Sequence, residues 1–226
     1  MKDLIQDFSS HIQSALDIAG STELTEVDRR IDNVLITGLG GSGIGGTAAA
    51  DLLGQHCRVP ILVNKGYDLP AFAGPNTLVI ASSYSGNTEE TIAVFEAARE
   101  KHCEIACITS GGQLGELARA HDLNALYMPG GNPPRSMFGY SFTLLLVMLS
   151  HYELADSGLL KDAAASLSLL HKEEKDIQEK AGELARFLFK KIPVIYAADG
   201  FEGVAVRFRQ QVNENGKMLC WHHVIP

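Results

Sequence analysis

The stretch SYSGNTEET places several hydroxyl side chains in one turn, between an apolar run and an acidic helix start. Ser83, Ser85 and Thr88 are the candidates for chemistry, because hydroxyls and free N–H groups at a helix N-terminus form a charge-neutral anion site. A helix cap is the competing explanation, since Asn87 with Glu90 three residues later resembles a capping box. A cap needs only one or two of these side chains. The turn therefore favours an anionic ligand such as a phosphate.

A second turn, GLGGSG, follows an apolar run and satisfies the pattern GxGxxG from Gly38 onward. A dinucleotide site also needs an acidic residue about 20 positions later, at the end of the second strand, to bind a ribose. That place holds Asn64 and Lys65. The turn also contains Ser42, a side-chain donor, where a dinucleotide mainly needs bare backbone. The sequence therefore disfavours an NAD site.

Short apolar runs alternate with helical segments in the first part of the chain. This alternation predicts an α/β fold with a flavodoxin-like, doubly wound parallel sheet of five strands. Ligands bind such sheets at the carboxyl ends of the strands, where three of these runs end in turns rich in Gly and Ser. The expected strands are 33–37, 61–63, 77–82, 104–109 and 125–128.

The composition limits the possible partners. The 226 residues carry a formal net charge of −8, which argues against nucleic acid or an anionic membrane as a partner. The four cysteines form no CxxC pair, and no signal peptide follows Met1. The most apolar window, 142–149, is far shorter than the roughly 20 residues that span a bilayer. We therefore expect a cytoplasmic protein.

Apolar residues at helical spacing continue after the fifth strand. The segment 141–150 is expected to be a buried helix, and 160–188 one long helix or a broken pair, with 4–19 as a helix before the first strand. A packing role is the expected one for the stripe along 160–188.

A second sheet begins near the end of the sequence, with a strand at 193–197 and a helix at 204–212. One strand and one helix cannot form a domain, so we expect these 226 residues to belong to a longer protein. The expected division is a first domain at 1–152, a helical connection at 153–191 and an incomplete second domain at 192–226.

Four motifs in order, GLGGSGIGG, SYSGNTEET, NPPRSMFGY and RFRQQVNENGK, resemble the bifunctional phosphoglucose/phosphomannose isomerases. These enzymes belong to the sugar isomerase (SIS) superfamily. The SGNTEET element marks SIS domains generally, whereas the PPR…GY and NENxK elements narrow the resemblance to this family. It implies interconversion of glucose 6-phosphate, and of mannose 6-phosphate, with fructose 6-phosphate through a cis-enediol, in a homodimer without a metal or redox cofactor.

The resemblance also implies residue roles. Ser83, Ser85 and Thr88 would hold the 6-phosphate, and Gly41 and Ser42 would contact the substrate at its sugar end.

Two charged residues complete the implied site. Arg135 would stabilise the negative charge of the enediolate, and Glu214 would be the base that moves a proton between C2 and C1. The family's ring-opening histidine follows later in an ExxHNE-like segment, and a family lysine lies later still. His222 and His223 do not match that motif, so we expect the catalytic set to be incomplete within these residues.

Two other functions share the fold. A non-catalytic phosphosugar-binding SIS module would need the phosphate turn but neither Arg135 nor Glu214, and it would normally carry a DNA-binding segment. An aminosugar-phosphate isomerase would not need the PPR and NENGK elements.

Overall fold

A computed structural model describes residues 1–54, 56–156 and 158–226 of the chain. Its main sheet has five parallel strands in the order β2-β1-β3-β4-β5, which is the flavodoxin-like order. The strands are β1 (Asn33–Thr37), β2 (Ile61–Asn64), β3 (Thr77–Ser83), β4 (Glu104–Thr109) and β5 (Asn124–Tyr127). All five predicted strands are confirmed, with end residues within one position of those expected.

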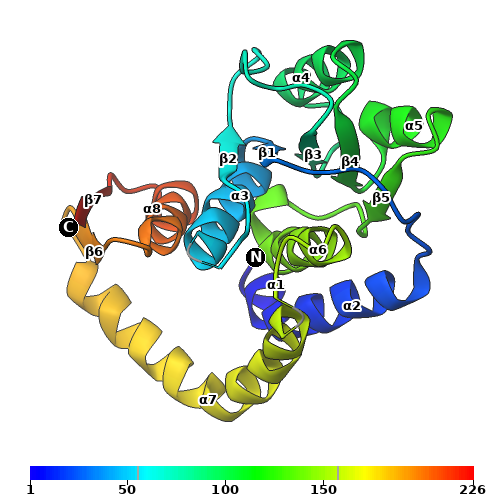
Figure 1. The fold of residues 1–226 in the computed structure, drawn as a ribbon. Helices are drawn as coiled ribbons and strands as arrows, with labels where there is room; N and C mark the ends of the chain where they lie inside the picture. Colours follow the sequence, from blue (N-terminus) through cyan, green and yellow to red (C-terminus); the bar gives the residue numbers. More distant parts are fainter. Residues whose placement is uncertain (55, 157) are drawn as a thin grey trace.

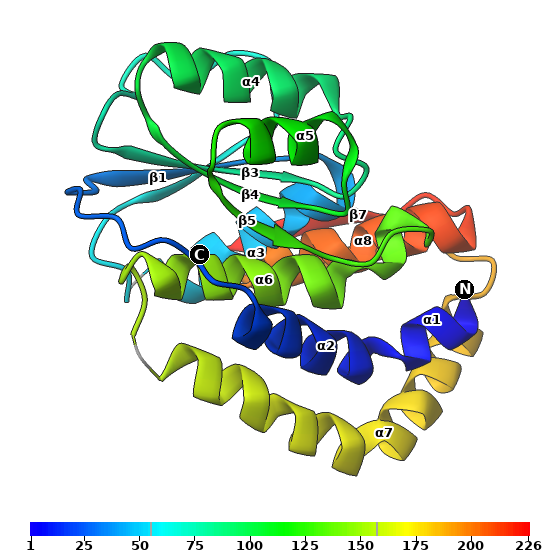
Figure 2. The same ribbon diagram turned by 90° about the vertical axis from the view of Figure 1, so that its right-hand side faces the viewer.

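Helices cover both faces of this sheet, as Figures 1 and 2 show. In Figure 2 the layers run from α4 and α5 through the sheet to α3 and α6, and then to the outer helices α2 and α7. The inner helices are α3 (Gly40–Leu53), α4 (Glu89–Glu100), α5 (Gly112–Ala120) and α6 (Phe138–His151). The predicted doubly wound fold is therefore confirmed.

The two faces of the sheet have separate hydrophobic cores. Ile36, Ile80 and Leu144 belong to the core beneath α3 and α6, whereas Val79 and Phe95 belong to the core beneath α4 and α5. The central strand β3 is buried at all seven positions. A strand covered on both faces needs apolar residues on both, which explains the continuous run TLVIA.

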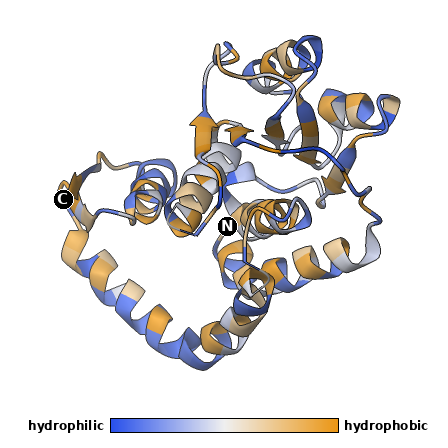
Figure 3. Cartoon of the chain, in the orientation of Figure 1, coloured by the Kyte–Doolittle hydropathy of each residue, from blue (hydrophilic) through white to orange (hydrophobic). Residues whose placement is uncertain are grey.

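An outer layer packs against α6. It consists of α1 (Lys2–Gln6), α2 (Phe8–Ser21) and the long helix α7 (Leu159–Leu188). The prediction of one helix over 4–19 is wrong in one respect. The helix is interrupted at Asp7, which is the C-cap of α1 and the N-cap of α2. The segment 160–188 forms one continuous helix, and Figure 3 shows hydrophobic and hydrophilic residues alternating along it.

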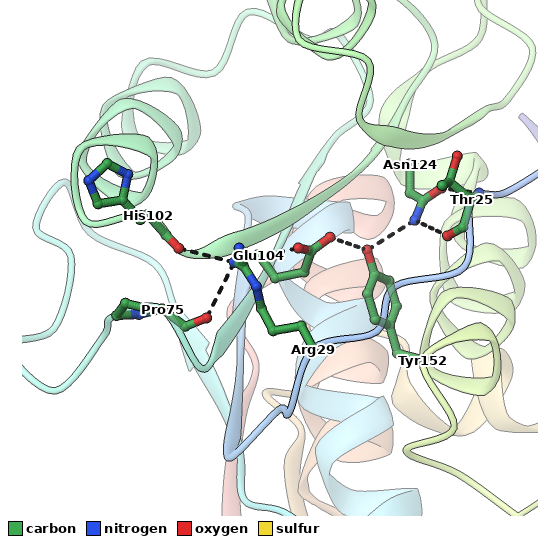
Figure 4. Close-up of polar contacts among 7 residues, drawn as sticks. All are labelled: Thr25, Arg29, Pro75, His102, Glu104, Asn124 and Tyr152. Carbon is green, nitrogen blue, oxygen red and sulfur yellow. Dashed lines mark hydrogen bonds and ion pairs between the residues drawn. The ribbon is translucent and has the colours of Figure 1, made fainter.

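The segment between α2 and β1 is fixed to the amino ends of β4 and β5 by a polar network (Figure 4). The Tyr152 hydroxyl donates to Glu104 Oε1 at 2.9 Å and accepts from Asn124 Nδ2 at 3.2 Å, while Asn124 Oδ1 accepts the Thr25 N–H at 2.7 Å. Arg29 lies 3.6 Å from Glu104 Oε2. This network lies at the sheet edge opposite the predicted ligand site and therefore organises the fold.

The C-terminal unit is a β-α-β element made of β6 (Val194–Ala198), α8 (Glu202–Gly216) and β7 (Trp221–Ile225). Its two strands pair in parallel, and both alternate between exposed and half-buried residues. Helix α8 packs on α3 of the first unit, as Figure 1 shows. Over the described part of the chain, the helices are too short or too polar to cross a membrane.

Candidate functional site

The serine/threonine turn follows β3 at the carboxyl edge of the main sheet. Ser83 is only 1% exposed, and its Oγ accepts the Gly86 N–H at 3.1 Å and lies 2.7 Å from Thr88 Oγ1. Ser85 is exposed, and its Oγ accepts the Asn87 N–H at 3.2 Å. Ser83 therefore holds the turn together from beneath, whereas Ser85 and Thr88 are accessible on top.

The predicted capping box at Asn87 is wrong. Helix α4 begins at Glu89, its N-cap residue is Thr88, and no described side chain caps it. The Asn87 side chain turns instead to the next helix, where its Oδ1 accepts the Gln113 N–H at 3.0 Å. The first N–H groups of α4 consequently remain available, which an anion site at a helix N-terminus requires.

The turn after β3 also contacts the turn after β4. Gly86 has φ +71°, a conformation that favours glycine, and a β-carbon there would overlap the carbonyl oxygen of Gly111. The Ser110 N–H and hydroxyl both donate to the Tyr84 carbonyl, at 3.0 and 2.6 Å. Contacts between these two loops hold the hydroxyl turn rigid.

Two carboxylates in the first turn of α4 work against an anion there, and their orientation matters. Glu89 Oε2 accepts from the Tyr67 hydroxyl at 3.4 Å. The negative charges of Glu90 and then Glu89 raise the pKa of the Tyr67 phenol, so both carboxylates lie near that ring. Tyr67 belongs to the loop after β2, so both carboxylates of the helix start face that loop.

The glycine turn after β1 approaches the loop that carries Arg135. A β-carbon on Gly41 would lie 3.1 Å from the Pro134 carbonyl oxygen, so only a hydrogen at this position allows the observed approach without a shift. Ser42 is buried in the first turn of α3. Lys65 brings a positive charge to α3, where its Nζ lies 3.3 Å from Thr47 Oγ1.

The loop before α6 is held by the hydroxyl turn. The Asn132 N–H donates to the Tyr84 hydroxyl at 2.9 Å, and a short 3₁₀ turn, η1 (Pro134–Ser136), then carries Arg135. Gly41, Tyr84 and Arg135 therefore place the three motifs that follow β1, β3 and β5 around one position at the carboxyl edge.

Helix α8 brings the fourth motif to this edge. Arg135 Nε donates to Asn215 Oδ1 at 2.9 Å, and Asn215 follows Glu214, which is exposed in the last turn of α8. At the other end of the helix, Asp51 Oδ2 accepts the Gly203 N–H at 2.5 Å, which fixes the α8 N-terminus to α3. The structure thus joins the loop that carries Arg135 to the last turn of α8, which carries Glu214.

The two C-terminal histidines lie on β7, away from this cluster. His222 Nε2 is 3.7 Å from Glu202 Oε1, and the His223 ring meets Tyr196 edge-on at 6.1 Å. Neither contact involves Glu214 or Arg135. Within the described ranges, no group of three His, Cys, Asp or Glu residues has the arrangement of a metal site.

Comparisons with known proteins identify the family of this chain. The family model "SIS domain" matches residues 29–152, and "Bacterial phospho-glucose isomerase C-terminal SIS domain" matches residues 177–226. The bifunctional phosphoglucose/phosphomannose isomerase of Caldicellulosiruptor bescii is 36% identical over 231 residues, covering 99% of this chain and 68% of the relative. The chain belongs to the bifunctional phosphoglucose/phosphomannose isomerase family.

Not every relative has the activity of this isomerase family. The D-glucosamine-6-phosphate 4-epimerase of Sulfolobus acidocaldarius is 32% identical over 201 residues, covering 86% of this chain and 61% of the relative. Three further phosphoglucose/phosphomannose isomerases are matched over 57–59% of their own length. The chain thus spans between 57% and 68% of the length of these four isomerases.

A solved structure with the same fold is the C-terminal domain of glucosamine-fructose-6-phosphate aminotransferase from Francisella tularensis. It superposes with a TM-score of 0.76 at 13% identity, covering 98% of this chain and 68% of that one. At this identity the likeness shows the SIS fold alone, as expected for this isomerase family.

Sequence reasoning missed the residues that join the motifs. Tyr84, Asn132 and Asn215 each make a contact between two loops or between a loop and α8. Tyr84 and Asn215 stand inside quoted motifs, beside the residues predicted to act. Their positions were visible in the sequence, but their partners were not.

Proposed function

We propose that the protein, in its full length, interconverts glucose 6-phosphate and mannose 6-phosphate with fructose 6-phosphate through a cis-enediol. The observation that carries this proposal is the Arg135–Asn215 hydrogen bond of 2.9 Å. It holds a cation against the helix turn that carries Glu214, at the sheet edge that also holds the hydroxyl turn. A phosphate grip alone would serve a sensor, whereas a base and a cation beside it serve proton transfer.

The phosphate is bound without a formal positive charge from the turn itself. Ser85 and Thr88 donate hydroxyls from the exposed side, and the first N–H groups of α4 donate from the helix end. Ser83 supports the phosphate site by orienting Thr88 and Gly86. Gly41 and Ser42 line the sugar end, where Lys65 adds a positive charge.

Glu214 carries one carbon-bound proton of the substrate, and no redox equivalents pass to or from the protein. Glu214 takes the C2 proton of the open-chain aldose, and the electron pair shifts so that the C1 carbonyl oxygen becomes the enediolate oxygen. Arg135 stabilises that negative charge. Return of the carbon-bound proton to C1, with the O2 proton passing to O1 as the C2 oxygen becomes a carbonyl, gives the ketose.

Assembly and location are part of the proposal. The described chain divides into a domain at 1–152, a connection at 153–191 and part of a second domain at 192–226. The protein acts as a homodimer, for which the exposed apolar residues along α7, such as Leu169 and Ile177, supply contact surface. The four cysteines are free thiols, which suits the reducing cytoplasm.

The base is tested by Glu214→Gln in the full-length enzyme, with Glu202→Gln at the start of the same helix as matched control. Loss of a general base lowers kcat by about 10²–10⁴-fold, with little change in KM for fructose 6-phosphate. The control variant retains wild-type turnover. Unchanged turnover in Glu214→Gln would show that another group is the base. Glucosamine 6-phosphate is assayed in parallel, because one relative is a 4-epimerase.

The phosphate grip is tested by Thr88→Val with Ser85→Ala. Loss of two hydroxyls that donate to a charged group raises KM by roughly 10- to 100-fold, at about 1–3 kcal/mol for the pair. Thr91→Val is the matched control, because Thr91 is fully buried in the same helix turn and its hydroxyl has no partner within the described part of the chain. A KM unchanged in the double variant contradicts the assignment.

A further inference from the structure

Arg207 makes a contact that the proposed mechanism does not use. It lies on α8, two turns before Glu214, and its Nη2 donates to the backbone carbonyl of Arg135 at 2.6 Å. Its guanidinium carbon lies 4.8 Å from the centre of the Phe138 ring, at the start of α6. Arg207 therefore contacts both the backbone of the loop that carries Arg135 and the first residue of α6, the helix that follows this loop.

The same face of α8 contacts Arg135 a second time. Arg207, Gln211 and Asn215 are spaced four residues apart, so they form one row along the helix. The side-chain amides of Gln211 and Asn215 lie 2.8 Å apart, and Asn215 Oδ1 accepts from Arg135 Nε. Arg135 is thus held at its carbonyl by the first member of the row and at its side chain by the last.

The environment of Arg207 is costly for a cation. Burial lowers the pKa of its guanidinium, and the nearby negative charge of Glu214 acts in the opposite direction. The charge is compensated by the Arg135 carbonyl, by the Phe138 ring and by the Gln211 side-chain oxygen, which accepts from Arg207 Nη1 at 2.9 Å in the amide orientation that satisfies both groups. A purely packing role would be met more cheaply by an apolar side chain.

We propose that Arg207 is the positioning residue that sets Arg135 opposite Glu214. This inference rests on the proposed isomerase function. Arg207 itself does not touch the substrate. It fixes the distance between the cation that stabilises the enediolate and the helix that carries the base.

The chemistry requires an arginine at this position. A planar guanidinium can donate in its plane to a carbonyl while its face lies on an aromatic ring, whereas a lysine ammonium is a compact point charge that does one or the other less well. Arg207→Lys therefore keeps the charge but loses part of the geometry, and Arg207→Met keeps the bulk but loses both.

The test is steady-state kinetics on full-length Arg207→Met and Arg207→Lys, with Arg209→Met as matched control on the same helix. We expect kcat to fall 10-fold or more in Arg207→Met, and less in Arg207→Lys, while KM for fructose 6-phosphate stays within about twofold. This split follows because the phosphate grip on α4 does not depend on Arg207. Arg209→Met keeps wild-type kcat. Equal kcat in Arg207→Met and Arg209→Met overturns the proposal.

Hydrogen exchange separates this inference from the proposed function. In Arg207→Met the amides of Asn132, Arg135, Ser136 and Met137 should exchange at least 10-fold faster, while those of β3 and α4 do not change. Protection that is unchanged in that loop overturns the positioning role whatever the enzyme does. A wild-type enzyme without isomerase turnover instead refutes the proposed function, and the exchange data then decide alone whether Arg207 positions the loop.

Discussion

The two units of this molecule differ in how completely their sheets are buried. In the first unit β3 is buried at every position, and both faces of its sheet are covered by helices. In the C-terminal unit β6 and β7 alternate between exposed and half-buried residues, and Tyr196 and Trp221 are 64% and 51% exposed. Within these 226 residues, the proposed phosphate site thus lies on a sheet that helices cover on both faces, whereas the proposed base lies on a helix whose own sheet has exposed residues.

Helix α8 acquires a fixed position mainly from contacts outside its own sheet. Its own sheet has two strands, and such a small sheet gives a helix little support. The contacts that place α8 come instead from the first unit, through Asp51 at its N-terminus and Arg135 near its C-terminus. Within these 226 residues, the helix that carries the proposed base is therefore held by the unit that carries the proposed phosphate site.

The comparison predicts unequal costs for the same substitution in the two sheets. Ile80→Ala in β3 removes a fully buried side chain and should lower the free energy of unfolding by about 2–5 kcal/mol. Ile225→Ala in β7, where the side chain is 48% exposed, should cost about 1 kcal/mol or less in the 226-residue chain. Urea denaturation of both variants measures this, and equal losses would contradict the contrast.

A second prediction breaks the contact between the units. A β-carbon on Gly203 would lie 2.7 Å from the Ala48 Cα, so Gly203→Ala pushes α8 away from α3. We expect kcat of the full-length enzyme to fall about 10-fold or more, because Glu214 moves with the helix. Gly182→Ala in α7 is the control, since its β-carbon meets only Arg186 Nη1 at 3.7 Å. Wild-type kcat in Gly203→Ala would show that the α3–α8 contact does not place the base.

The smallest expected effect concerns the opposite edge of the first sheet. Tyr152→Phe removes the hydroxyl that links Glu104 and Asn124 and should cost about 1 kcal/mol of stability, with kcat unchanged. Reduced turnover would mean that this network reaches the site.

The same variant has a defined pH dependence. Burial raises the pKa of the Tyr152 phenol above its ordinary value of about 10, so above that pH the unfolded state binds fewer protons than the folded state. This group therefore stabilises the fold fully below about pH 10, and its contribution falls as pH rises further, by up to about 1.4 kcal/mol per unit. Denaturation between about pH 9 and 11 should show a shallower fall in Tyr152→Phe than in wild type. Equal slopes would contradict the shift.

Much of the fold could be predicted from local patterns. β1 and β4 begin and end at the residues expected from NVLIT and EIACIT, because a buried parallel strand is a short continuous apolar run. The break at Asp7 was missed because apolar spacing continues across it. The cap at Asn87 was misread because its partner, the Gln113 N–H, lies 26 residues away on another helix.

The site could be predicted only as separate motifs. Ser85 is exposed and Thr88 half-buried on their turn, but local sequence could not show that Ser83 is buried. The pairing of Arg135 with Asn215 joins positions 80 residues apart. Such a contact depends on how α8 packs on α3, which no local pattern contains.

The central claim is that α8 brings a proton-transfer base to the proposed phosphate-binding edge of the first sheet. Deuterium exchange tests this claim most directly. Full-length wild type and Glu214→Gln are incubated with fructose 6-phosphate in D₂O, and deuterium at C1 of the ketose and C2 of the aldose is followed by NMR. We predict incorporation by the wild type and a rate at least about 100-fold lower in Glu214→Gln. Incorporation at the wild-type rate in Glu214→Gln would contradict the account.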